Sequence, residues 1–87
     1  MKAIGIFAID SWHLANSIHF PEVKTSSITD FELAVDWLAN IAVDYGLRDE
    51  NGDKITRACI VEECGKNGAR IFFSSPREGY LILRLEK

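Results

Sequence analysis

The chain has 87 residues, with 10 lysines and arginines against 13 aspartates and glutamates, so its formal net charge at pH 7 is −3. A hydrophobic content of 47% excludes a disordered chain, and this length suits one domain with one modest core. Two cysteines are too few for a disulfide scaffold, and every apolar run is too short to span a membrane. We therefore expect a single domain over residues 1–87, cytoplasmic, with reduced thiols and no membrane association.

Residues 2–9 predict a buried strand, because apolar side chains occupy both its odd and its even positions, for example Ile4 and Phe7. The segment 11–20 is ambiguous. It is either a short helix capped by Ser11 or, after a turn near residues 14–17, a second strand that residues 22–27 extend.

Residues 29–46 predict the main helix. Thr29 and Glu32 have the spacing of a capping box, and Gly46 is placed to end the helix in a left-handed conformation. One stripe of apolar residues recurs at helical spacing: Phe31, Ala34, Val35, Leu38, Ile41, Ala42 and Tyr45.

Residues 54–63, 70–74 and 80–86 predict three strands of an antiparallel meander. Asn67-Gly68 is a strong hairpin signal between the first two, and Pro76 suits the turn between the last two. The elements follow the order β-(β or short α)-α-β-β-β. This order indicates an α+β fold, a two-layer sandwich with one main helix packed on a four- to five-stranded, mostly antiparallel sheet.

A single helix covers only one face of such a sheet. Phe72 and Phe73 are adjacent in a strand and must point to opposite faces, so we expect apolar surface on the face away from the helix. Either residues 11–20, with Trp12 as the covering side chain, or a second chain covers that surface.

The segment 9–20 contains both histidines and raises the question of a catalytic or metal site. In a strand His13 and His19 lie roughly 20 Å apart, and in a helix they point about 120° apart, so neither arrangement places both on one metal ion. Asp10 and Ser11 are neighbours and point to opposite faces of a strand, which does not suit a nucleophile and its base. We expect no catalytic residue, no metal and no cofactor.

Two further patterns are interpreted as structural. Residues 49–53 resemble the opening of a calcium loop, but Lys54 and Ile60 stand where that loop needs a glycine and a glutamate, so we expect a turn. Basic and aromatic residues late in the chain are typical of a nucleic-acid platform, but the acidic chain opposes phosphate binding, so we expect no direct nucleic-acid contact. These residues are Lys66, Arg70, Arg77 and Arg84 with Phe72, Phe73 and Tyr80.

The predicted helix is unusually acidic. Residues 25–47 include no lysine or arginine but four acids, which are Asp30, Glu32, Asp36 and Asp44. Like charges one turn apart, and an acid at the negative end of the helix dipole, are unfavourable for stability alone. We therefore predict a partner-binding face made of Glu32, Leu33, Asp36, Trp37, Asn40 and Asp44, the alternative being that the acids serve only solubility and Trp37 packs under a loop.

These observations favour a small acidic, non-enzymatic binding protein that docks on a basic surface of a partner protein, in particular a nucleic-acid-binding one. In size, acidity and compactness the chain is similar to small inhibitors carried by phages and mobile elements, such as anti-CRISPR proteins, although no motif carries the likeness. The alternative function is a self-associating regulatory or ligand-binding module, a homodimer formed through the uncovered sheet face or an edge strand.

Overall fold

The computed structural model describes residues 2–13, 18–26, 30–75 and 78–86, with the backbone alone for residues 10–13, 18–22, 75 and 86. Its strands are β1 (Lys2–His13), β2 (Ile18–Thr25), β3 (Arg48–Asp49), β4 (Ile71–Ser75) and β5 (Gly79–Glu86). Its helical elements are α1 (Phe31–Asp44), α2 (Arg57–Ile60) and the π-helix η1 (Val61–Lys66). The strands form one antiparallel sheet in the order β2-β1-β5-β4-β3.

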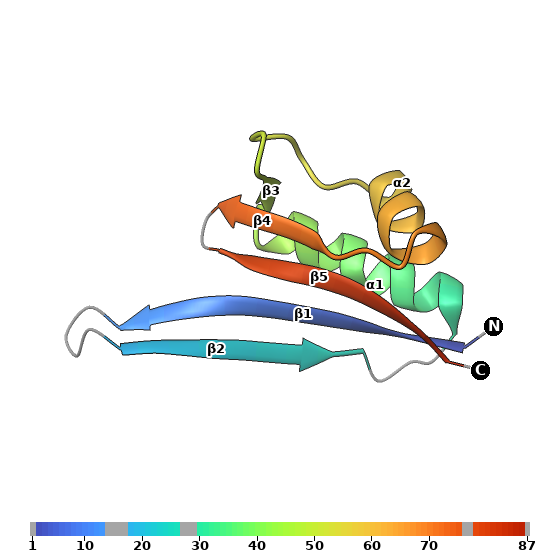
Figure 1. The fold of residues 1–87 in the computed structure, drawn as a ribbon, viewed down its shortest axis with the longest axis horizontal. Helices are drawn as coiled ribbons and strands as arrows, with labels where there is room; N and C mark the ends of the chain where they lie inside the picture. Colours follow the sequence, from blue (N-terminus) through green and yellow to red (C-terminus); the bar gives the residue numbers. More distant parts are fainter. Residues whose placement is uncertain (1, 14–17, 27–29, 76–77, 87) are drawn as a thin grey trace.

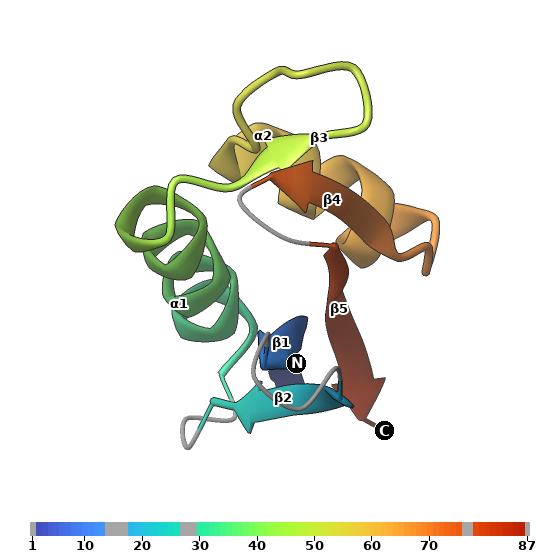
Figure 2. The same ribbon diagram turned by 90° about the vertical axis from the view of Figure 1, so that its left-hand side faces the viewer.

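Both helices pack on the same side of this sheet (Figures 1 and 2). The expected α+β fold is therefore confirmed, with one main helix, a short second helix and a five-stranded antiparallel sheet. No helix in the described part of the chain is long and apolar enough to cross a membrane.

Helix α1 forms where its apolar stripe predicts it, and five residues of that stripe are buried: Ala34, Val35, Leu38, Ile41 and Ala42. Its N-cap is Asp30, whose carboxylate accepts a hydrogen bond from the Leu33 N–H at 3.2 Å. The capping box led by Thr29 is therefore wrong as to the capping residue, and Thr29 itself lies outside the described residues. Gly46 has φ +63°, as expected of a glycine that ends a helix.

The segment expected to be a strand at residues 54–63 is helical instead. Thr56 caps α2 by accepting a hydrogen bond from the Cys59 N–H at 3.2 Å, and Ile60 and Cys64 are buried one turn apart. The predicted hairpin turn at Asn67-Gly68 is also wrong, because η1 ends at Lys66 with Asn67 as its C-cap, and Gly68 follows with φ +64°. A left-handed glycine suits a helix end and a hairpin turn equally, so this local signal could not separate them.

The ambiguous segment after residue 10 returns as a strand. β1 pairs with β2 from Ile6↔Thr25 to His13↔Ile18, and with β5 from Lys2↔Glu86 to Ile9↔Gly79. Beyond Ile9, β1 therefore pairs with β2 alone, and this hairpin extends past the other strands (Figure 1). The Trp12 side chain, expected to cover the sheet, lies outside the described side chains.

The core lies between the sheet and the helices. Phe7 and Phe73 stack with their ring centroids 5.9 Å apart, and Leu81 is fully buried beside them on β5. Buried Ser26 accepts a hydrogen bond from the Gly5 N–H at 3.0 Å, which joins the residue after β2 to the N-terminal half of β1. This core holds α1 at a fixed position across β1 and β5.

No helix of the described part of the chain lies over the other face of the sheet, where the sequence predicts apolar surface (Figure 2). Phe73 is 2% exposed on the helix side, whereas its neighbour Phe72 is 51% exposed. We call this face, away from both helices, the open face; its residues are Ile4, Ile6, Ala8, Val23, Phe72, Tyr80, Ile82 and Arg84.

Candidate functional site

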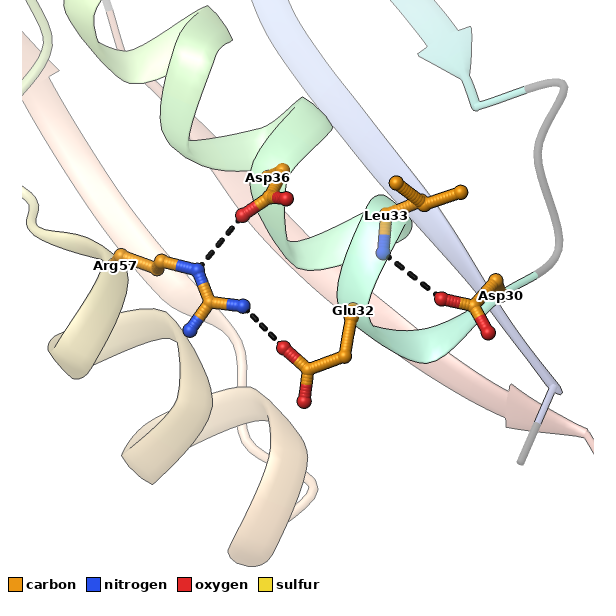
Figure 3. Close-up of polar contacts among 5 residues, drawn as sticks. All are labelled: Asp30, Glu32, Leu33, Asp36 and Arg57. Carbon is orange, nitrogen blue, oxygen red and sulfur yellow. Dashed lines mark hydrogen bonds and ion pairs between the residues drawn. The ribbon is translucent and has the colours of Figure 1, made fainter.

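The six residues of the predicted binding face form two adjacent rows on the exposed side of α1. Glu32 and Asp36 face α2, whereas Leu33 lies on the other side of the helix from Arg57 (Figure 3). Trp37 lies one turn after Leu33 and packs over β1, and Asn40 and Asp44 continue the same helical spacing. The sequence therefore places these residues on the right helix, and the ion pairs of Glu32 and Asp36 with Arg57 set these two apart from the other four.

Arg57 of α2 binds both acids of the row that faces α2, Glu32 and Asp36. Its Nε donates to Asp36 Oδ1 at 2.7 Å, and its Nη2 pairs with Glu32 Oε2 (Figure 3). The hydrogen bonds to Asp36 and then to Glu32 raise the pKa of the Arg57 guanidinium above its ordinary value. These two carboxylates therefore have a cation from another segment of the chain, which the absence of lysine and arginine from residues 25–47 did not predict.

Arg57 could not be matched to α1 from the sequence because its segment was assigned to a strand. The missed signal is Thr56, which has the residue type and position of a helix N-cap, with buried Ile60 and Cys64 at helical spacing after it. A helix that begins at Arg57 directs this side chain toward the acidic row of α1.

The second row is a ridge on the solvent side of α1. We call Leu33, Trp37, Asn40 and Asp44 the α1 ridge. Leu33 is 48% exposed and Trp37 is half-buried, while Asn40 and Asp44 are exposed. Asp44 lies in the last turn, which contains no basic residue, and no residue in the described part of the chain forms an ion pair with it.

Trp37 owes its position to a glycine. A Cβ on Gly5 would lie 2.9 Å from Trp37 Cε3 and 3.0 Å from Leu38 Cγ. The missing side chain at Gly5 lets α1 approach β1 closely, so one part of the indole packs on the strand and the rest reaches the surface. An aromatic side chain held in this way loses little freedom when it binds a partner.

A groove of about 440 Å³ lies beside the C-terminal half of α1, and sequence reasoning missed it. Asn40 and Val43 line it from the helix, and Arg48 and Lys54 line it from the loop that follows. Val43 is 76% exposed, which makes it the most exposed of the large apolar residues that the structure describes. No periodicity identifies this groove, since it depends on how residues 47–57 pass the helix.

The side chains of the other chemical candidates, from Asp10 to His19, lie outside the described side chains, and only their backbone register is described. The register pairs His19 with Trp12 and His13 with Ile18, so the two histidines are not opposite each other. Among the described residues no three histidine, cysteine, aspartate or glutamate side chains are grouped as metal ligands. The segment 49–53 is a turn, in which Asp49 Oδ1 accepts hydrogen bonds from the N–H groups of Asn51 and Asp53.

Comparison of the chain with protein-family models, with curated proteins and with solved structures finds no match.

Proposed function

We propose that this protein is a small, non-enzymatic, cytoplasmic binding module that docks on a partner protein through the α1 ridge. The observation that carries the proposal is a 48% exposed Leu33 one turn from a half-buried Trp37 on a rigid helix. An aliphatic side chain beside a preorganised indole is typical of an interface anchor. Because Glu32 and Asp36 pair with Arg57, the proposed docking site consists of the other four of the six predicted residues.

The chemistry of the ridge supports a partner that is apolar at one end and basic at the other. Leu33 and Trp37 offer apolar surface, and Asp44 offers a carboxylate at the negative end of the α1 dipole. Since Arg57 neutralises part of the charge of Glu32 and Asp36, the electrostatic attraction comes mainly from Asp44. A basic surface of a nucleic-acid-handling protein fits this chemistry, and its occupation would make the protein an inhibitor of the kind found in phages and mobile elements.

Site-specific photo-crosslinking in cells of the source organism tests this proposal. A photoreactive amino acid replaces Leu33 in one variant and Val43 in the control, because Val43 is exposed on the same helix but points roughly 80° away from Leu33, at about 100° per residue. We expect a discrete covalent product with one other protein from position 33 and none from position 43. We also expect D44K to reduce the yield from position 33 several-fold while the far-UV circular dichroism stays unchanged.

Two outcomes would contradict the proposal. One is the absence of any product from position 33 under conditions in which the variant is folded and expressed. The other is the same product, in the same yield, from positions 33 and 43, which would mean that contact does not depend on the ridge.

A further inference from the structure

The open face presents apolar side chains to solvent along the length of the sheet. Val23 is 57% exposed and Phe72 is 51% exposed, and Ile6 and Ile82 lie partly exposed between the two ends of the face. Contiguous apolar surface of this kind is typical of a protein interface. We propose that a second copy of this chain packs on the open face, so that the protein forms a two-fold symmetric dimer, sheet against sheet.

One end of the open face is hollow and acidic. A groove of about 540 Å³ lies there, lined by Ala8, Val23, Phe72 and Tyr80 and by the exposed Glu50 and Glu78. The rings of Phe72 and Tyr80 meet edge to face with centroids 6.3 Å apart. This end therefore suits an apolar side chain with a positive charge beyond it.

The other end of the open face carries the opposite charge. Arg84 is exposed six residues after Glu78, roughly 20 Å along the strand at about 3.3 Å per residue. Glu50, Glu78 and Arg84 have no ion-pair partner within the part of the chain that the structure describes. Arg70 lies over the Tyr80 ring at 4.8 Å, so the acidic end keeps a surplus of one negative charge, whereas the exposed Lys2 adds to the positive charge of Arg84 at the other end.

This distribution is complementary to itself. A two-fold axis that runs parallel to the two faces and perpendicular to β5, level with the point between Tyr80 and Ile82, brings Glu78 of each copy opposite Arg84 of the other. It also places Tyr80 against Ile82 of the second copy and directs the Arg84 chain toward the aromatic groove. Face-to-face packing of two sheets with nearly aligned strands is a common arrangement in proteins.

The sheet edges are less suited to self-association than the face. β2 is an edge strand, but Pro21 lies in its middle and offers no N–H to an added strand. β3, at the other edge, has two residues. A dimer through the open face leaves both copies of the α1 ridge exposed, because the helices lie on the other side of each sheet (Figure 2). This inference is thus independent of the proposed docking through α1.

Charge exchange within the pair Glu78 and Arg84 tests the dimer. We expect sedimentation equilibrium of the purified chain to show a reversible dimer. E78R and R84E should each raise its dissociation constant at least about tenfold, because each puts like charges opposite one another. The double variant E78R/R84E should restore the original dissociation constant. D44R is the control, since it changes the net charge by the same amount as E78R but lies on α1, and it should leave the dimer unchanged.

Several results would overturn the inference. A monomer at every concentration up to the millimolar range is one, and a dimer that neither single exchange weakens is another. A double exchange that dimerises no better than the single variants would show that Glu78 and Arg84 do not meet across an axis. A single-stranded oligonucleotide that binds the open face of a monomer would assign the aromatic groove to nucleic acid instead. Circular dichroism of each variant establishes that the fold is retained.

Discussion

The two cysteines are free and differ in burial. Cys59 lies on α2 and is partly exposed, whereas Cys64 lies on η1 and is buried. Cys64 is buried on η1 against β5, and its Sγ lies 3.8 Å from the Leu81 carbonyl oxygen. Burial raises the pKa of the Cys64 thiol from its ordinary value of 9.0 to about 11. The pKa of Cys59, which is partly exposed, is also raised, first by desolvation and then by the charges of Glu63 and Asp49. Neither thiol has the lowered pKa of a reactive nucleophile.

The pH dependence of stability follows from Cys64. Its folded pKa of about 11 lies above the unfolded value of 9.0, so the folded state holds the proton more tightly. Unfolding then releases a proton between pH 9 and about 11, and the free energy of unfolding falls as the pH rises through this range. Urea unfolding at a series of pH values should show this decline, and C64A, which lacks the thiol, should show a smaller one. An equal decline in both proteins would contradict the assignment.

At the scale of elements, one guanidinium links α1 and α2 at the surface, beside the apolar core that both helices share. Arg57 lies at the start of α2 and bridges Glu32 and Asp36, which repel each other one turn apart on α1. The sequence correctly predicts α1 and its buried stripe, because seven apolar residues recur at helical spacing. It does not predict α2, because residues 54–63 mix apolar and polar side chains in a pattern that fits a half-buried strand as well as a helix.

Removing the Arg57 charge should destabilise the protein in a salt-dependent way. We expect R57Q to lower the thermal midpoint at low ionic strength, because it leaves the Glu32 and Asp36 carboxylates facing each other unpaired. The difference from the original protein should shrink at high salt, since these groups are exposed and screened.

The matched control is K66Q. It breaks the Lys66–Glu62 pair, 3.4 Å long, which joins two residues of the same segment and no separate elements. K66Q should therefore have the smaller effect. A thermal midpoint that falls equally in R57Q and K66Q would show that the ion pairs between α1 and α2 stabilise the protein no more than a pair within one segment does.

At the scale of the whole molecule, the sheet separates two surfaces with different roles. Phe73 contributes to the core that fixes α1, and Phe72, the preceding residue, belongs to the open face. The two phenylalanines are a matched pair, because they are adjacent in β4 and differ only in which side of the sheet they occupy.

Alanine substitution should separate stability from association. We expect F73A to lower the free energy of unfolding by about 3–5 kcal/mol, because it removes a buried ring from the core. F72A should change it by only about 0.5 kcal/mol at concentrations where the protein is monomeric, yet raise the dimer dissociation constant about tenfold. Urea unfolding and sedimentation equilibrium measure the two effects. A large loss of monomer stability in F72A would mean that the open face is covered within the chain.

The α+β fold, the position of α1 and the apolar face away from the helices follow from the sequence alone. Each of these features depends on apolar residues that recur with the period of a helix or a strand. This period can be read from neighbouring residues, whatever the tertiary arrangement of the elements. The helical state of residues 57–66, the split of the acidic face and the grooves were decided by the tertiary structure. They depend on contacts between segments that are far apart in the chain, such as the ion pairs of Arg57 with Glu32 and Asp36. The local sequence does not indicate which distant segments come into contact.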